Sequence, residues 1–292
     1  MIRHHYKLKA GTKTAAVFEM MQPLLYESHM HTPLCRHARG EPEEYAAVGK
    51  ERGLKGIIVT CHNPLPDGLA QSSRMYTEQW DEYLQLIERA NADSDIEVLL
   101  GLEADFLPGL EPFLEKQLSS APFNHVLGSV HPQINEYQTR FYTGDDFALQ
   151  QQYFAHLAEA AETGLFDTLA HPDLVKNLVP QEWDFERIQP HIERALDRIA
   201  ATGTAMELNT SGLLKAIPEM NPAPEILRLM NERNIPVVIG ADAHVPERVA
   251  NNYEAAMDLL EDAGYDSISF FLKRERQEVS IADARASLIS TQ

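Results

Sequence analysis

The chain has 292 residues, of which 44% are hydrophobic and 24% are charged, as is usual for a soluble globular protein. Its formal net charge of −19 opposes binding to long nucleic acids and anionic membranes, and no apolar run is long enough to span a membrane. The two cysteines, Cys35 and Cys61, are too few for a disulfide framework and predict a cytoplasmic location.

Residues 1–22 precede the first apolar segment and are basic at first, then mildly apolar. Glu19 and Gln22 interrupt the apolar part, so we predict no signal peptide. We interpret these residues as an N-terminal extension of a single domain that spans residues 1–292. No feature of the sequence assigns an oligomeric state.

Short apolar segments alternate with longer segments of helical periodicity along the rest of the chain. The expected strands are 23–31, 54–62, 96–106, 124–131, 166–171, 203–212, 235–244 and 267–272. The expected helices include 42–53, 76–91, 148–164, 185–203 and 223–234, two of which end on the glycines Gly164 and Gly203. The repeated strand–helix order predicts a parallel sheet with crossover helices, and its length favours a barrel over an open sheet.

Polar residues stand at or just after the ends of the first seven apolar segments. They are His29, His31, His62, Glu103, His131, His171, Asn209, Asp242 and His244. Because the C-terminal ends of parallel barrel strands meet at one face, we expect these side chains to converge on one pocket.

The residue types at these strand ends indicate a metal site. His29 and His31 are two residues apart, as are Asp242 and His244, so each pair points to one side of its strand. Imidazole and carboxylate suit zinc, manganese or iron. Six or more histidines and two carboxylates exceed the needs of one ion, so Glu103 is expected to bridge ions.

The motifs around these residues resemble those of the PHP (polymerase and histidinol phosphatase) family, in particular its monofunctional histidinol-phosphate phosphatases. The motifs are HMH (29–31), CRHARGEPEEY (35–45), CHNPLP (61–66), GLEADF (101–106), LGSVH (127–131), AHPDL (170–174), ELNTSGL (207–213) and GADAH (240–244). The resemblance implies a single PHP domain, folded as a distorted (β/α)7 TIM-like barrel with its metal site at the C-terminal ends of the strands.

The resemblance also implies two to three divalent ions, Zn, Mn or Fe. By motif position, the first ion is assigned to His29, His31, Glu103 and Asp242, the second to Glu103, His131 and His171, and the third to His37, His62 and His244. Glu103, Asp242 and His244 are the expected catalytic residues. His4, His5, His125, His156 and His191 are expected to be unrelated to the site.

The implied reaction is hydrolysis of L-histidinol phosphate to L-histidinol and phosphate in histidine biosynthesis. Two alternatives remain at this point: a phosphoesterase for another small phosphate ester or nucleotide, and a non-catalytic metal-binding module. Arg140 and Lys176 are preferred over Arg36, Arg39 and Arg248 as cations that bind the substrate phosphate. Asn209 and Ser211 either orient the substrate or make the turn after a strand.

Two positions depart from the family pattern. Glu27 stands where aspartate is usual, and we expect it to support the site from behind the ligands. Cys61 stands where these phosphatases commonly have an acid. If that acid protonates the leaving group, this chain uses Asp67 or a metal-bound water instead, and Cys61→Asp should speed the reaction by on the order of a hundredfold or more. Cys35 and Cys61 are either zinc ligands or, as we favour, buried free thiols.

Overall fold

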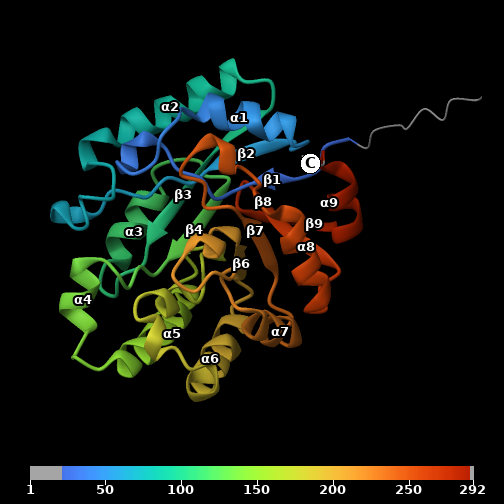
Figure 1. Ribbon diagram of the computed structural model, residues 1–292. Coiled ribbons are helices and arrows are strands. Elements are labelled where there is room, and N and C mark those ends of the chain that lie inside the picture. The colour runs from blue at the N-terminus through green and yellow to red at the C-terminus, as the bar shows by residue number, and fades with distance from the viewer. Residues whose placement is uncertain (1–21, 290–292) are drawn as a thin grey trace, which may run out of the picture.

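The computed structural model describes residues 22–289 (Figure 1). The predicted extension, apart from residue 22, lies outside the described residues, as do His4 and His5. None of the described helices is long and apolar enough to cross a membrane.

Seven parallel strands form one sheet in which each strand pairs with the next along the chain. They are β1 (Tyr26–Glu27), β2 (Gly56–Val59), β3 (Glu97–Asp105), β4 (His125–Ser129), β5 (Thr168–Leu169), β6 (Ala205–Asn209) and β7 (Val237–Gly240). Every residue of β2, β4, β6 and β7 is buried, as expected for parallel strands covered on both faces.

The two edges of this sheet meet just beyond the ends of β1 and β7. The backbone N–H of His31 donates to the carbonyl of Ala243 (3.0 Å), and the N–H of Ala243 donates to the carbonyl of His29 (2.9 Å). The buried carboxylate of Glu27 strengthens this junction, since it accepts hydrogen bonds from the backbone N–H groups of His29, Ala241 and Ala250. The predicted seven-stranded barrel is therefore confirmed.

Helices surround the strands and follow one another around the barrel (Figure 1). They are α1 (Pro42–Glu51), α2 (Trp80–Asp93), α3 (Glu111–Leu118), α4 (Asn135–Phe141), α5 (Asp146–Glu162), α6 (Phe185–Ala200), α7 (Pro224–Glu232), α8 (Tyr253–Asp262) and α9 (Ile281–Ser287). The five predicted helices correspond to α1, α2, α5, α6 and α7. Gly164 and Gly203, with φ of 67° and 77°, follow α5 and α6 in the left-handed region that glycine tolerates.

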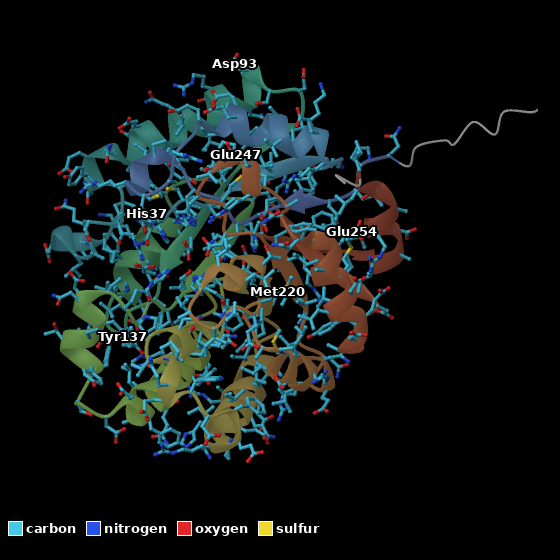
Figure 2. All side chains as sticks on the ribbon, in the orientation of Figure 1. His37, Asp93, Tyr137, Met220, Glu247 and Glu254 are labelled. Atoms are coloured by element: carbon cyan, nitrogen blue, oxygen red, sulfur yellow. The ribbon has the colours of Figure 1, made fainter. Side chains whose placement is uncertain are left out.

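Many side chains with polar atoms project from the outer rim of the molecule (Figure 2). Tyr137 and Met220 are buried, whereas Asp93 and Glu254 are exposed on the outer surfaces of α2 and α8. Capping begins two of the longer helices: Asp145 accepts from the N–H of Ala148 at α5, and Asp184 accepts likewise at α6.

The eighth apolar segment forms a strand outside the barrel sheet. β8 (Ser267–Leu272) pairs antiparallel with β9 (Glu275–Ser280). Phe271 of β8 stacks on the ring of His125, with centroids 4.9 Å apart, at the first residue of β4. It also packs against Ala205, the first residue of β6. The hairpin therefore covers the N-terminal end of the barrel, and His125 is a core residue, as predicted.

Candidate active site

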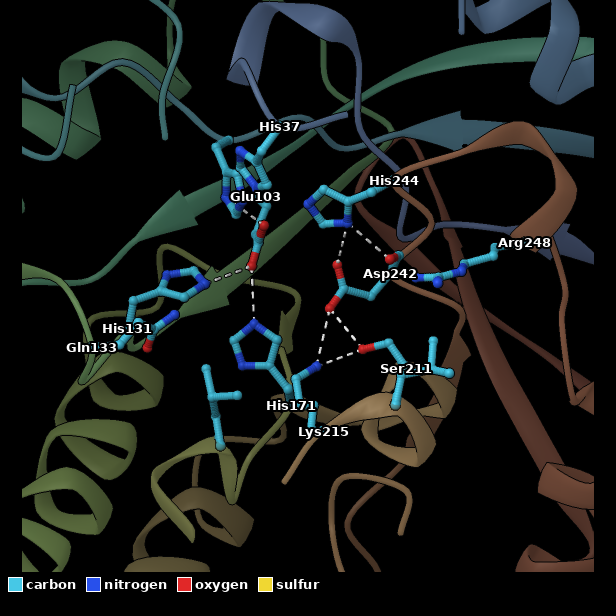
Figure 3. Close-up of a pocket in the computed structure, with 13 residues that line it drawn as sticks. His37, Glu103, His131, Gln133, His171, Ser211, Lys215, Asp242, His244 and Arg248 are labelled. Atoms are coloured by element: carbon cyan, nitrogen blue, oxygen red, sulfur yellow. Dashed lines mark hydrogen bonds and ion pairs between the residues drawn. The ribbon is translucent and has the colours of Figure 1, made fainter. Parts of the chain in front are cut away.

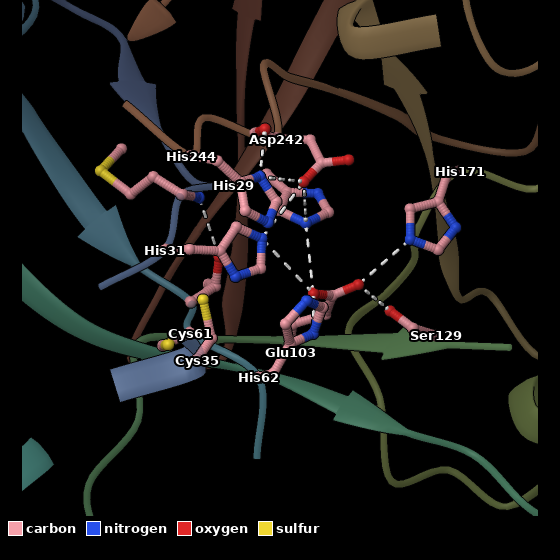
Figure 4. Close-up of polar contacts among 12 residues, drawn as sticks. His29, His31, Cys35, Cys61, His62, Glu103, Ser129, His171, Asp242 and His244 are labelled. Carbon is pink, nitrogen blue, oxygen red and sulfur yellow. Dashed lines mark hydrogen bonds and ion pairs between the residues drawn. The ribbon is translucent and has the colours of Figure 1, made fainter. Parts of the chain in front are cut away.

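The nine predicted metal ligands lie together at the C-terminal ends of the strands (Figures 3 and 4). Seven of them line a pocket of about 340 Å³, namely His37, His62, Glu103, His131, His171, Asp242 and His244. The other two, His29 and His31, are fully buried.

The Glu103 carboxylate lies at the centre of this cluster and faces a different set of histidines with each oxygen. Oε1 lies 3.1 Å from Nε2 of His171 and 3.5 Å from Nε2 of His131. Oε2 lies 3.5 Å from Nε2 of His29 and 3.6 Å from Nε2 of His31. The carboxylate is thus placed to bridge two ions.

Asp242 joins the set on the Oε2 side of Glu103. Its Oδ1 lies 3.2 Å from Nε2 of His31 and 3.6 Å from Nε2 of His29. Its Oδ2 accepts a hydrogen bond from Oγ of Ser211 (2.9 Å) and lies 3.6 Å from Nζ of Lys215. One oxygen therefore faces the histidines while the pocket wall holds the other.

The remaining three histidines gather around the ring of His31. The centroid of His244 lies 4.0 Å from that of His31 and 4.5 Å from that of His37. The His62 ring lies 4.3 Å from that of His31, and its Nδ1 lies 2.6 Å from Oε2 of Glu103 without the alignment of a hydrogen bond. This set corresponds to the third group of predicted ligands.

Several donor atoms of the cluster are buried and have no hydrogen-bond partner within residues 22–289. They include Nε2 of His29, Nδ1 of His62, Oε2 of Glu103 and Nε2 of His244. An unpaired buried polar atom costs about 1–3 kcal/mol, which a bound ion would offset. Imidazole nitrogens and carboxylate oxygens are the ligands that zinc, manganese and iron accept. The residues present therefore fit a cluster of divalent ions.

Charge within the cluster favours a cation at its centre. Burial raises the pKa of Glu103, but neighbouring His62 and His29 outweigh burial and hold this pKa well below its ordinary value. Burial lowers the pKa of His29, but the carboxylates of Glu207, Asp242 and Glu103 outweigh it and raise this pKa well above its ordinary value. The carboxylates therefore stay ionised and attract positive charge.

Two of the candidate ligands have strained backbones. His171 and Asp242 have φ of 30° and 48°, in the left-handed region that residues other than glycine seldom adopt. Such strain persists where the surrounding structure holds the residue in place, and it is concentrated at functional sites. The two residues with this unusual backbone conformation are thus both members of the ligand cluster.

Carboxylates behind the ligands orient two of the histidine rings. Nδ1–H of His29 donates to Glu207 on β6, and Nδ1–H of His131 donates to Asp105 on β3, each at 2.6 Å. Each contact turns Nε2 of the ring toward the cluster. Gly240 makes room for the first contact, because a Cβ there would clash with Oε1 of Glu207.

Arg74 holds Asp105 in place. The side chain is buried, and its Nε and Nη2 donate to Oδ2 of Asp105 at 2.8 and 2.6 Å. Oδ1 of Asp105 remains free to accept from His131.

We expect Asp105→Asn to weaken ion binding by about 10–100-fold, because the amide no longer fixes the orientation of His131 as a carboxylate does. Isothermal titration with Zn²⁺ or Mn²⁺ measures the affinity. Asp95→Asn is the matched control, since Asp95 is 77% exposed and, among the described residues, pairs only with Lys50 at the surface. Equal affinities in both variants would contradict a role for Asp105 in the site.

Asn209, predicted to bind substrate or to make a turn, makes the turn. It is fully buried, its Oδ1 accepts from the N–H of Ser211 (3.0 Å), and the same oxygen lies 2.7 Å from Oγ of Ser211. Its Nδ2 donates to Oε2 of Glu207 (3.0 Å). Both ends of the Asn209 side-chain amide therefore have hydrogen-bond partners within the protein, and Asn209 does not line the pocket.

Lys176 and Arg140, the preferred phosphate-binding cations, also lie outside the pocket. Lys176 is fully buried, and its ammonium donates to Asp173 (2.8 Å) and Glu219 (2.9 Å). Arg140 is exposed on α4 and donates to the carbonyl of Pro108 (2.6 Å). The structure therefore does not bring either cation to the ligands.

The cationic residues that do line the pocket are Lys215 and Arg248. Nζ of Lys215 donates to Oγ of Ser211 (2.6 Å), which places the ammonium beside Asp242. Arg248 is a less favoured candidate in the sequence analysis. Lys215, which lies two residues beyond the motif 207–213, is not identified there.

The orienting carboxylates carried a signal that could have identified them. Asp105 is two residues from Glu103, and Glu207 is two residues from Asn209, so each lies on the inward face of its strand. Arg74 stands in the long loop between β2 and α2, where no such periodicity applies.

Cys61 does not reach the pocket, although it precedes His62. It is fully buried, and its Sγ accepts a hydrogen bond from Oγ1 of Thr32 (3.2 Å). The thiol cannot deliver a proton to a leaving group from this position, so the geometry gives no reason for Cys61→Asp to raise the rate. Asp67, the alternative acid, is exposed on a turn and does not line the pocket either.

The fold and the site together define a barrel protein with a metal centre of the hydrolytic type at the C-terminal ends of its strands. The chain belongs to the PHP domain family, which matches residues 27–211.

Relatives of known name share most of the chain. It is 38% identical over 261 residues to the "Probable histidinol-phosphatase" of Deinococcus radiodurans, covering 84% of this chain and 96% of that protein. It is 24% identical over 263 residues to the "Histidinol-phosphatase" of Bacillus subtilis, covering 80% and 98%.

A solved structure shares the fold. The histidinol phosphate phosphatase of Lactococcus lactis, crystallised with zinc, L-histidinol and phosphate, matches with a TM-score of 0.71 at 18% identity. The match covers 86% of this chain and 98% of that one.

Proposed function

We propose that this chain is a metal-dependent phosphomonoesterase that hydrolyses L-histidinol phosphate to L-histidinol and phosphate. The supporting observation is that nine suitable ligands cluster together, seven of them lining one pocket, in a chain 38% identical over most of its length to a protein named a histidinol-phosphatase. Both cysteines are free, which fits the reducing cytoplasm as the site of this step of histidine biosynthesis.

The proposed cofactors are two to three divalent ions, Zn, Mn or Fe. His29, His31 and Asp242 would hold the first together with Oε2 of Glu103. His131 and His171 would hold the second with Oε1 of Glu103, and His37, His62 and His244 would hold the third. When bound, such ions neutralise the charge of a phosphate and activate water for attack on phosphorus.

The residues of the pocket wall bind and orient the phosphate ester. The ammonium of Lys215 and the guanidinium of Arg248 line the pocket beside the ligands and donate charge-assisted hydrogen bonds to phosphate oxygens. Ser211 fixes Lys215 by accepting from Nζ, and it donates in turn to Asp242. The cation that receives the phosphate is therefore held in a fixed relation to the ligand Asp242.

We expect Lys215→Ala to raise KM for the phosphate ester by about 10–100-fold, which corresponds to the loss of a charge-assisted hydrogen bond. Steady-state kinetics at saturating ion concentration measure the effect. Arg140→Ala is the control, because Arg140 lies on the outer surface of α4, and its KM should stay unchanged. A raised KM in the Arg140 variant alone would restore the assignment made from the sequence.

The direct test is phosphate release from a panel of esters by protein loaded with Mn²⁺ or Zn²⁺. The proposal expects the highest kcat/KM for L-histidinol phosphate among histidinol phosphate, sugar phosphates, nucleoside monophosphates and an aryl phosphate. A higher kcat/KM for another ester would reassign the substrate. Ion-loaded protein that hydrolyses none of them would support the non-catalytic alternative.

One observation favours the alternative of a different small phosphate ester. Within residues 22–289, the carboxylates that line the pocket are Glu103 and Asp242, both assigned to ions. The ammonium of histidinol would therefore share the pocket with Lys215 and Arg248 without a carboxylate of its own. A more anionic ester, such as a nucleotide, would meet these cations more favourably.

A further inference from the structure

A second group of donor atoms lies beside the cluster, on the far side of His31 from Asp242 (Figure 4). It consists of Cys35, Cys61 and a ring nitrogen of His31, and the three donor atoms lie within 4.8 Å of one another. We call this group the thiol site. Cys35 ends the turn after β1, and Cys61 follows β2, so two neighbouring strand ends supply all three residues.

The nitrogen of His31 that belongs to the thiol site is Nδ1. Nε2 faces Asp242 and Glu103, at 3.2 and 3.6 Å. The two nitrogens of an imidazole point in different directions, and Figure 4 shows the other nitrogen turned toward Cys61. Nδ1 is buried and has no hydrogen-bond partner within the described part of the chain.

Nδ1 of His31 shares this unpaired state with Nδ1 of His171, and it differs in this respect from Nδ1 of three other candidate ligands. Nδ1 of His29 and of His131 each donate to a carboxylate, and Nδ1 of His37 donates to the carbonyl of Cys35 (2.8 Å). A ligand histidine usually has such a partner for its second nitrogen. His31 has two thiols there instead.

The sulfur of Cys61 forms hydrogen bonds with Thr32 both as acceptor and as donor. Thr32 donates to Sγ from its hydroxyl (3.2 Å) and from its backbone N–H (3.5 Å). Sγ also donates to the carbonyl of Thr32 (3.8 Å), and a bound ion would take the place of this proton. Both cysteines are fully buried and free, so no disulfide competes for the sulfurs.

We propose that Cys35, Cys61 and Nδ1 of His31 form a separate metal site for a thiophilic ion such as Zn²⁺ or Cd²⁺. The ion would replace the proton of each thiol, and binding through both nitrogens would convert His31 to an imidazolate, so three protons would leave to solvent. His31 would then bridge this ion and the first ion of the histidine–carboxylate cluster through its two nitrogens.

The chemistry of the donors selects the ion. Thiolates are soft ligands that bind zinc strongly and manganese poorly, whereas the histidine–carboxylate cluster accepts both. In a tetrahedral zinc site with Zn–S near 2.3 Å, two sulfurs lie about 3.8 Å apart. The separations in the thiol site, within 4.8 Å, need only a small inward movement to reach that geometry.

The experiment titrates reduced, ion-free protein with Co²⁺ and follows the absorption spectrum. Nitrogen and oxygen ligands give visible bands only, whereas a cobalt thiolate adds a charge-transfer band in the near ultraviolet. The proposal expects this band in the wild-type chain and its loss in both Cys35→Ser and Cys61→Ser, with the visible bands of the cluster retained.

The two single variants separate the thiol site from a rival arrangement. Cys35 also lies within 4.8 Å of donor atoms of His37 and His244, so its sulfur could join the third ion of the cluster. In that case Cys61→Ser would keep the charge-transfer band and Cys35→Ser alone would lose it, which would overturn the proposal. Absence of the band from the wild-type chain would overturn it as well.

Cadmium-113 NMR of the wild-type chain tests the proposal without a variant. It expects one strongly deshielded resonance, from an ion with two sulfur ligands, in addition to those of nitrogen- and oxygen-bound ions. Only resonances of the latter kind would contradict it. Neither measurement uses a substrate, so the result is independent of whether the chain hydrolyses histidinol phosphate.

Discussion

Replacing Glu103 by glutamine is expected to lower kcat/KM by more than about a thousandfold and to lower the number of bound ions. Glu103 is fully buried and turns one oxygen toward His131 and His171 and the other toward His29 and His31. Glutamine replaces one oxygen by an NH₂ group, which cannot bind a cation, so one of the two ions loses a ligand. A metal ion supplies several kcal/mol of charge stabilisation in the transition state, and each 1.4 kcal/mol is about tenfold in rate.

His244→Ala provides the comparison, because His244 is assigned to one ion and Glu103 to two. We expect the histidine variant to lose less activity and at most one ion. Elemental analysis of dialysed protein gives the ion count, and kinetics on L-histidinol phosphate give the rate. Comparable turnover in Glu103→Gln and the wild type would show that Glu103 does not join two ions.

The convergence of the candidate ligands at the strand ends could be predicted because that inference needs only the order of strands along the chain. A polar residue at the end of each parallel strand must lie on one face of the barrel, whatever the exact twist of the sheet. His29, His62, His131 and Asp242 are all brought together in this way. These residues are spread over more than two hundred positions of the sequence, but successive parallel strands still bring them to the same face.

The lengths of the strands could not be predicted in the same way. The apolar segments 23–31 and 166–171 predict strands of ordinary length, but β1 and β5 have two residues each. The hydrogen-bonded strand pairing ends early where the backbone changes direction. The positive φ of His171, two residues after β5, marks such a change. The apolar segments are longer than the strands because the residues on either side of each strand are also buried in the protein.

The loop residues of the site were missed for a related reason. Lys215 and Arg74 reach the site from segments without regular structure, where side-chain direction depends on tertiary contacts and has no period. The hairpin of β8 and β9 illustrates the same limit at the other end of the barrel. Its apolar strand resembles a barrel strand in composition, but it pairs with the polar β9 in a separate sheet.

Lys176 lies close to His171 in the sequence but does not line the pocket. The residue follows the ligand His171 closely in sequence, and this made it a candidate for phosphate binding. In the structure its ammonium turns away from the pocket and joins a buried network with Asp173 and Glu219. Asp173 in turn accepts from Nδ2 of Asn221 and from the N–H of Ala223. The network ties the loop after β5 to the segment after β6.

We therefore expect Lys176→Met to lower the free energy of unfolding by about 3–5 kcal/mol, because it leaves the fully buried carboxylate of Asp173 without its cation. Urea denaturation measures the change. Arg198→Met is the matched control, since the pair of Arg198 with Glu162 is 39% and 44% exposed, and such surface pairs contribute at most about 1 kcal/mol.

Substrate binding distinguishes the structural role of Lys176 from the role expected from its motif. If the residue only holds the two loops together, the folded fraction of Lys176→Met should bind the phosphate ester with nearly the KM of the wild type. The double variant Lys176→Met/Asp173→Asn should then recover part of the lost stability, because it removes the unpaired charge as well. A variant as stable as the wild type with a strongly raised KM would instead place the ammonium on the phosphate, and the buried network would have to open to release it.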